Sequence, residues 1–200
     1  MKKILFYGDS NTYGYDPRGY FGMRYPSELR WTSLVREHFK DRFEIIEEGQ
    51  NGRCLPVLPR EEAFLIRLLE PLSAEDLLVI MLGTNDILLT DHPVADLAIR
   101  KMDRLLEWLV HREHAPICVV IGPVPIANTS MDMQVYYEES LRLNADYEAL
   151  CKEKGIAYFD AAKWDIPLAY DGVHFSEEGC RKFAGGVMGV VKHLPSFTTV

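Results

Sequence analysis

Three short polar clusters each follow an apolar run of the sequence, and their residue types suit one kind of chemistry. They occupy residues 8–11 (Gly-Asp-Ser-Asn), 83–86 (Gly-Thr-Asn-Asp) and 171–174 (Asp-Gly-Val-His). A serine hydroxyl is a weak nucleophile at neutral pH, so it needs a base to take its proton and donors to hold the charge on an attacked carbonyl oxygen. The clusters supply a serine, an amide donor, and an imidazole with a carboxylate. These groups predict a serine hydrolase site.

Ser10 is the candidate nucleophile, His174 the candidate base, and Asp171 the acid that orients it. Asp171 and His174 are three residues apart, so in a turn the carboxylate can reach Nδ1 of the imidazole and leave Nε2 free for Ser10. Each cluster alone has a plainer interpretation, because Ser10 could be a turn or helix-cap serine and the Asp-His pair a surface ion pair. The occurrence of all three clusters in one chain favours catalysis.

Three groups are candidate donors to an oxyanion: the backbone N–H of Ser10, the backbone N–H of Gly52 and the side-chain amide of Asn85. Asn85 can donate without titrating, and Gly52 has no side chain in the way of a substrate. Here too a plainer interpretation stays open: residues 83–86 could form a polar turn in which Asp86 caps the next segment, and Asn51-Gly52 a tight turn.

These residues need a scaffold, and the apolar pattern predicts a β-α repeat. Short apolar runs without alternation are typical of parallel strands that helices cover on both faces. We predict strands at residues 4–7, 43–46, 77–82, 117–121 and 156–159, and helices at 29–39, 61–69, 94–114, 135–154 and 176–191. Ser176 is the predicted N-cap of the last helix, which places His174 in the loop before it.

Ligands bind at the carboxyl ends of such strands, where two of the clusters and Asn51-Gly52-Arg53 lie. Long loops at this edge, 13–29 and 160–175, should shape the pocket. The first loop is rich in aromatic residues, namely Tyr13, Tyr15, Tyr20, Phe21 and Tyr25, which either line the pocket or pack as a satellite core. The candidate pocket residues are Asp9, Asn11, Tyr13, Trp31, Arg53 and Val173.

The bulk composition limits the partners. The chain has 200 residues, 48% hydrophobic and 26% charged, which predicts one globular domain over 1–200. A net charge of -8 and a pI near 5.3 leave no basic surface for nucleic acid or an anionic membrane. The partner that we expect is therefore a small-molecule ester.

The cysteines and the first residues bear on metal sites and location. Cys54, Cys118, Cys151 and Cys180 lie far apart and predict neither a zinc site nor a disulfide framework, and no other metal or cofactor motif is evident. Two lysines before a four-residue apolar run do not make a signal peptide, so we expect a cytoplasmic location.

The ordered blocks 8–12 (Gly-Asp-Ser-Asn-Thr), Gly52, 83–86 and Asp171-x-x-His174 resemble those of the SGNH (GDSL-like) hydrolases over nearly the whole chain. The resemblance implies a flavodoxin-like three-layer α/β/α sandwich with a central five-stranded parallel sheet. It also implies a Ser10-His174-Asp171 triad and an oxyanion hole formed by Ser10, Gly52 and Asn85.

Residues 30–32 (Arg-Trp-Thr), 51–53 and 80–86 resemble the small intracellular arylesterase/acyltransferase branch of that family, which implies a homo-oligomer whose neighbours wall the pocket. The chain departs from the pattern at Asn11, where the family has leucine, and at Cys54, where we expect threonine. Neither departure removes a catalytic group.

We therefore predict an esterase that hydrolyses short-chain, acetyl-like esters through an acyl-enzyme. If the pocket is apolar, an alcohol competes with water and the enzyme also transfers acyl groups. Three alternatives stay open: a lysophospholipase or thioesterase of the same family, a catalytically silent module that binds acylated ligands, and a structural protein whose loops serve assembly.

Overall fold

A central sheet of five parallel strands organises the computed structural model, which describes residues 1–20, 22–90 and 94–198. Phe21 of the aromatic loop lies outside these ranges. The strand order is β2-β1-β3-β4-β5, the flavodoxin-like order, in agreement with the fold that the family resemblance implied. The strands are β1 (Lys2–Gly8), β2 (Phe43–Gly49), β3 (Leu77–Met81), β4 (Ile117–Gly122) and β5 (Ala157–Asp160).

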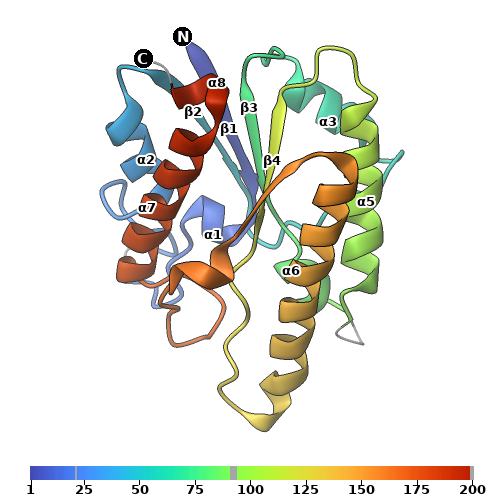
Figure 1. Cartoon of the computed structure of the whole chain (residues 1–200). Coiled ribbons are helices and arrows are strands. Elements are labelled where there is room, and N and C mark those ends of the chain that lie inside the picture. The colour runs from blue at the N-terminus through green and yellow to red at the C-terminus, as the bar shows by residue number, and fades with distance from the viewer. Residues whose placement is uncertain (21, 91–93, 199–200) are drawn as a thin grey trace.

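Helices cover both faces of the sheet and give three layers (Figure 1). One face packs against α2 and α7, with α8 beside them, and the other against α3, α5 and α6. The five long helices were predicted from the sequence. They are α2 (Trp31–Phe39), α3 (Glu62–Leu69), α5 (Asp96–Val110), α6 (Gln134–Lys154) and α7 (Glu177–His193). The short elements α1 (Ser10–Tyr13), α4 (Thr84–Leu88) and α8 (Pro195–Thr198), and the 3₁₀ turns Met131–Met133 and Ala161–Trp164, were not.

Strand β1 shows why its apolar run lacks alternation. Ile4 and Phe6 belong to the hydrophobic cluster on the side of α2 and α7, whereas Leu5 and Tyr7 belong to the cluster beneath α3, α5 and α6. All four are at most 4% exposed. A strand buried on both faces needs apolar side chains at successive positions.

The order in which strands are added to the sheet reverses at β1, because β2 pairs with one side of β1 and β3 with the other. In this topology the crevice for a ligand opens at the carboxyl ends of β1 and β3. The helices that follow these two strands are α1 and α4, which carry Ser10 and Asn85. The topology therefore brings two of the polar clusters to one crevice.

The two irregular loops that the sequence singled out are fastened to each other at this edge. The Tyr25 hydroxyl donates to the Phe175 carbonyl oxygen at 3.2 Å, and the Tyr170 hydroxyl donates to the Pro17 carbonyl oxygen at 2.9 Å. Arg18 adds an ion pair with Glu177. These contacts hold the segment before α7, with His174, against the segment after α1.

The opposite edge of the sheet holds both ends of the described chain (Figure 1). The Lys2 ammonium donates to the Ser196 carbonyl oxygen at 2.9 Å and lies 5.2 Å from the centre of the Phe197 ring. Within the described ranges, no helix combines the length and apolar character that a membrane span requires.

Candidate active site

Ser10 begins α1 directly after a tight turn at the end of β1. Asp9 caps the helix, since its Oδ1 accepts a hydrogen bond from the Asn11 N–H at 2.9 Å. A Cβ on Gly8 would lie 2.1 Å from Oγ1 of Thr12, so only glycine fits where the strand turns into the helix. The turn presents Ser10 at the carboxyl edge of the sheet.

Ser10, His174 and Asp171 form a continuous hydrogen-bonded series. Nε2 of His174 lies 2.9 Å from Oγ of Ser10, and Nδ1 of His174 lies 2.6 Å from Oδ2 of Asp171. The carboxylate therefore favours the imidazole tautomer with a proton on Nδ1, which leaves Nε2 free to accept the serine proton. This is the arrangement that the three-residue spacing predicted.

Asp171 also holds the turn that carries the histidine. Its Oδ1 accepts the backbone N–H groups of Val173 and His174, each at 3.0 Å. Partial burial raises the pKa of the Asp171 carboxyl, but the hydrogen bonds from His174 and Val173 outweigh it and leave the pKa below its usual value. Asp171 is thus ionised at neutral pH. The prediction that Ser176 caps α7 is correct, because its Oγ accepts the Gly179 N–H at 3.0 Å.

Asn11 joins the nucleophile turn to the histidine turn. Its Nδ2 donates to the Val173 carbonyl oxygen at 3.1 Å, and its Oδ1 accepts the Phe175 N–H at 2.9 Å. Both bonds flank His174, so Asn11 sets the position of the imidazole relative to Ser10. Sequence analysis placed Asn11 in the pocket, whereas in the structure its side chain is committed to the backbone and buried.

The three candidate oxyanion donors lie on three different elements. Among the described residues, neither the Ser10 N–H nor the Gly52 N–H donates to a protein acceptor. Gly52 has a φ of +72°, a left-handed conformation that favours glycine. Asn85 donates one N–H to the Arg53 carbonyl oxygen at 3.1 Å, and its amide has a second N–H to offer.

An aromatic ring that the sequence analysis did not assign to the site contacts His174 in a tilted arrangement. The ring centre of Tyr15 lies 4.5 Å from that of His174, at an interplanar angle of 49°. The only signal in the sequence was the aromatic richness of residues 13–29, which does not say which ring reaches the imidazole. The structure thus singles out Tyr15 among these aromatic residues.

Two other predicted pocket residues are buried in the protein interior. Trp31 is 2% exposed, packs between Phe6 and Phe183, and donates its indole N–H to the Asn11 carbonyl oxygen at 2.8 Å. It therefore supports α1 from the hydrophobic core and is not exposed to a ligand-sized space. Asp9 is 2% exposed, and burial raises its pKa to about 6.

The remaining predicted pocket residues lie nearer the surface or a cavity. Tyr13 is partly buried, with the Arg24 guanidinium 4.1 Å from its ring centre. Val173 is partly buried and packs against the cluster beneath α5 and α6. Arg53 donates to the Gly8 carbonyl oxygen at 3.0 Å and stacks over Tyr7, which anchors the loop of Gly52 to β1.

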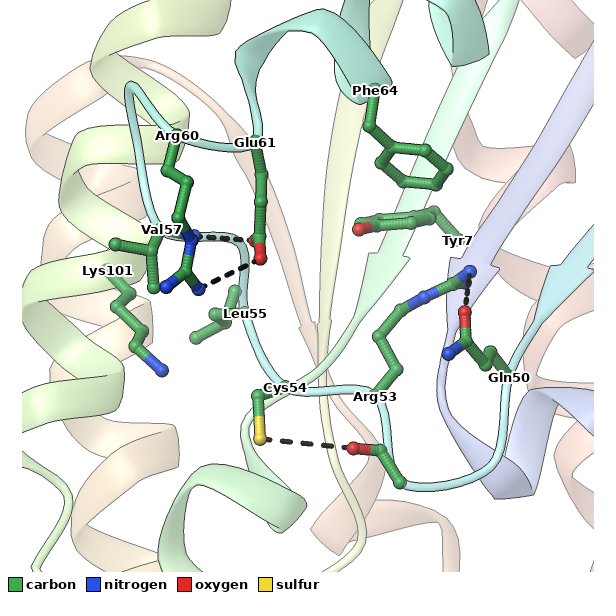
Figure 2. A pocket seen from close by; sticks show the side chains of 11 residues that line it. Tyr7, Gln50, Arg53, Cys54, Leu55, Val57, Arg60, Glu61, Phe64 and Lys101 are labelled. Atoms are coloured by element: carbon green, nitrogen blue, oxygen red, sulfur yellow. Dashed lines mark hydrogen bonds and ion pairs between the residues drawn. The ribbon is translucent and has the colours of Figure 1, made fainter.

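A cavity of about 400 Å³ adjoins the Gly52 loop (Figure 2). Gly52 lines it, whereas Ser10, His174 and Asp171 do not. Its walls come from β1, the loop after β2, α3 and α5, and include Tyr7, Arg53, Cys54, Phe64 and Lys101. The cavity therefore lies beside the Gly52 loop and is separate from Ser10.

The cysteines and other candidate metal ligands are dispersed. All four cysteines are free, and burial raises the pKa of the Cys54 thiol to about 11. Across the residues that the structure describes, no three side chains of histidine, cysteine, aspartate or glutamate are grouped as metal ligands would be.

The hydrogen-bonded serine, histidine and aspartate at the carboxyl edge of the sheet are typical of serine hydrolases, the class that the sequence predicted. Residues 6–182 match the model of the GDSL-like Lipase/Acylhydrolase family. The chain belongs to this family and is a carboxylic ester hydrolase. No curated protein matches the sequence significantly.

Solved structures of esterases superpose on nearly the whole chain. A carbohydrate acetylesterase family member from Sinorhizobium meliloti is 28% identical, with a TM-score of 0.83 and full coverage of both chains. A putative arylesterase from Agrobacterium tumefaciens is also 28% identical, with a TM-score of 0.77 over 96% of this chain and 99% of that one. The M. smegmatis aryl esterase is 26% identical, with a TM-score of 0.79 over 97% of this chain and 100% of that one.

Proposed function

We propose that the protein hydrolyses short-chain carboxylic esters with Ser10 as nucleophile. The observation that carries this proposal is the hydrogen-bonded series from Oδ2 of Asp171 through the His174 imidazole to Oγ of Ser10. In that geometry the base is already within hydrogen-bonding distance of the proton that it must remove.

The reaction follows from these contacts. Nε2 of His174 takes the proton as Oγ of Ser10 attacks the ester carbonyl, and Asp171 stabilises the imidazolium. The N–H groups of Ser10 and Gly52 and the Asn85 amide hold the oxyanion. The alcohol leaves with the proton from His174, and water then hydrolyses the acyl-enzyme by the same steps in reverse order.

A small acyl group, acetyl above all, is the substrate that we favour. The similar structures described as arylesterases and carbohydrate acetylesterases support it. The alcohol would be aryl, alkyl or sugar. Where an alcohol outcompetes water for the acyl-enzyme, the same site transfers the acyl group, and ester product in the presence of added alcohol tests this.

The assembly and location of the protein are further parts of the proposal. We propose a homo-oligomer, because large apolar side chains at the carboxyl edge are solvent-exposed in the single chain, among them Tyr20, Met131 and Tyr170. Light scattering tests it. Free cysteines support a reducing, cytoplasmic environment, and the acidic charge supports small-molecule partners and neither nucleic acid nor membranes.

The test of the function is hydrolysis of p-nitrophenyl acetate, butyrate and octanoate by the wild type and by Ser10→Ala. Loss of the nucleophile should lower kcat by about 10⁴- to 10⁶-fold. A preference for octanoate would instead favour a lysophospholipase or thioesterase. Absence of Ser10-dependent turnover, together with no labelling by a fluorophosphonate probe, would favour a silent binding module.

A further inference from the structure

A buried carboxylate lies directly behind the candidate oxyanion hole. Asp86 follows Asn85 in α4, and its side chain is 0% exposed. Its Oδ2 accepts the Leu55 N–H at 2.9 Å, and its Oδ1 accepts a hydrogen bond from Nζ of Lys101 at 2.7 Å. Asp86 therefore connects three elements: α4, the loop after β2, and α5. Among the described residues it makes no capping contact with a following segment, which was the plainer interpretation of its motif.

These contacts join the two elements that carry oxyanion donors. Leu55 is three residues after Gly52, and Asn85 directly precedes Asp86. Asn85 and Arg53 make a second link between the same elements, from Nδ2 to the carbonyl oxygen at 3.1 Å. Two links side by side fix both the distance and the rotation of the Gly52 loop relative to α4.

Lys101 supplies the charge that this arrangement requires. An ionised carboxylate without exposure to water is costly unless a cation and hydrogen-bond donors compensate it. Burial raises the pKa of Asp86, and the bonds from Lys101 and Leu55 act in the opposite direction. Lys101 reaches it from α5 and also lines the cavity beside Gly52 (Figure 2).

We propose that Asp86, neutralised by Lys101, is a positioning residue that aligns Gly52 and Asn85 on one carbonyl oxygen. The proposal rests on the esterase function proposed above. Asp86 touches no substrate and acts through the elements that it joins. A displacement of about 1 Å in such a site can cost up to about 10²-fold in rate.

Kinetics of Asp86→Asn, Asn85→Ala and the double variant with p-nitrophenyl acetate test the proposal. Asp86→Asn should lower kcat roughly 10- to 100-fold and change KM by less than about threefold, because oxyanion contacts form in the transition state. Asn85→Ala should lower kcat about 10²- to 10³-fold. In the double variant, Asp86→Asn should slow the Asn85→Ala enzyme by a smaller factor than it slows the wild type, because the contribution through Asn85 is already lost and only Gly52 is still misplaced.

Asp76→Asn is the matched control. Asp76 is also a buried aspartate that accepts two backbone N–H groups, those of Lys3 and Ser73, but it lies at the opposite edge of the sheet. It should lose stability and keep the wild-type kcat. Wild-type kcat in folded Asp86→Asn, or multiplicative losses in the double variant, would overturn the proposal.

Variants of Lys101 test the same proposal if Asp86→Asn does not fold. Lys101→Met should lower kcat, and Lys101→Arg should restore most of it, since arginine keeps the charge; full activity of Lys101→Met would contradict the proposal. Ser10→Ala in the same assay tests the esterase function separately. Hydrogen exchange of the Leu55 amide is independent of activity: it should be faster in Lys101→Met than in the wild type, and equal rates would count against the link.

Discussion

Asn11 is neither a candidate triad residue nor a candidate oxyanion donor, yet its hydrogen bonds fix the position of His174. Its two side-chain hydrogen bonds hold the carbonyl of Val173 and the N–H of Phe175 on either side of His174. In the chain, Asn11 is 163 residues away from that histidine. The Ser10–His174 distance therefore depends on a neighbour of the nucleophile.

Asn11→Ala should lower kcat by about 10- to 100-fold, because the imidazole loses its register with Ser10. It should also lower the free energy of unfolding by about 2 kcal/mol, since the Phe175 N–H loses its acceptor. Esterase kinetics and urea unfolding measure the two effects. Asn144→Ala is a suitable control, because Asn144 is another buried asparagine bonded to a backbone carbonyl, that of Pro123. It should lose stability alone; an equal loss of kcat would contradict the role of Asn11.

Asp9 is a second residue whose environment has a measurable consequence. Burial raises its pKa to about 6 from an ordinary value of 3.8, with the Asn11 N–H and His174 acting in the opposite direction. The folded state therefore binds a proton more tightly than the unfolded state. By linkage, stability is highest below the unfolded pKa and falls as pH rises from 3.8 to about 6.

Asp9→Asn should remove this loss, because asparagine keeps the cap to Asn11 and carries no charge. Relative to the wild type, the variant should gain about 2 kcal/mol of unfolding free energy between pH 4 and pH 7. Urea unfolding at both pH values measures it, and the same difference at both would refute the prediction. Asp76→Asn should instead lose unfolding free energy relative to the wild type as pH rises. Burial raises the pKa of Asp76, but the hydrogen bonds from Lys3 and Ser73 outweigh burial and lower the pKa. The ionised Asp76 carboxylate therefore stabilises the fold above its unfolded pKa.

At the scale of elements, the strands and long helices could be predicted from the sequence, because apolar runs and helical periodicity indicate them. All five strands and all five long helices were predicted, since each buries a face that its residue pattern shows. Helices α1 and α4 were not, because four or five residues are too few for a periodic signal. Trp31 was assigned to the pocket from its place near an aromatic loop, whereas packing against Phe6 and Phe183 depends on the tertiary fold.

Helix α7 contains two adjacent glycines in contrasting surroundings. A Cβ on Gly185 would meet no atom within 4 Å, whereas a Cβ on Gly186 would lie 2.3 Å from the Trp164 ring. Gly185→Ala should therefore raise the free energy of unfolding by about 0.5–1 kcal/mol through helix propensity. Gly186→Ala should lower it by about 1–3 kcal/mol through overpacking. Thermal and urea unfolding compare them, and a shift of the same sign in both would show that Trp164 does not constrain α7.

In the whole molecule, the candidate active site lies at one edge of the sheet, and the start of β1 and helix α8 lie at the opposite edge. The hydrogen bond between Ser10 and His174 joins residues 164 positions apart, so the site exists only in the complete fold. At the other edge, α8 closes the core beside the start of β1, where Phe197 packs against Phe43 with ring centres 5.3 Å apart.

Phe197→Ala should separate stability from catalysis. Phe197 is 1% exposed, so its truncation should lower the free energy of unfolding by about 3 kcal/mol. The change lies at the edge away from Ser10, so kcat/KM of the folded variant should stay at the wild-type value. Urea unfolding and p-nitrophenyl acetate kinetics on one preparation measure both quantities. A lower kcat/KM under conditions in which the variant is still folded would show that this edge affects the site.

The contact of Lys2 with Ser196 has a practical consequence for handling the protein. This contact holds the start of β1 and α8 together at the edge of the sheet away from Ser10. A surface or fusion partner attached at this edge would therefore leave the crevice open to solvent and to incoming esters.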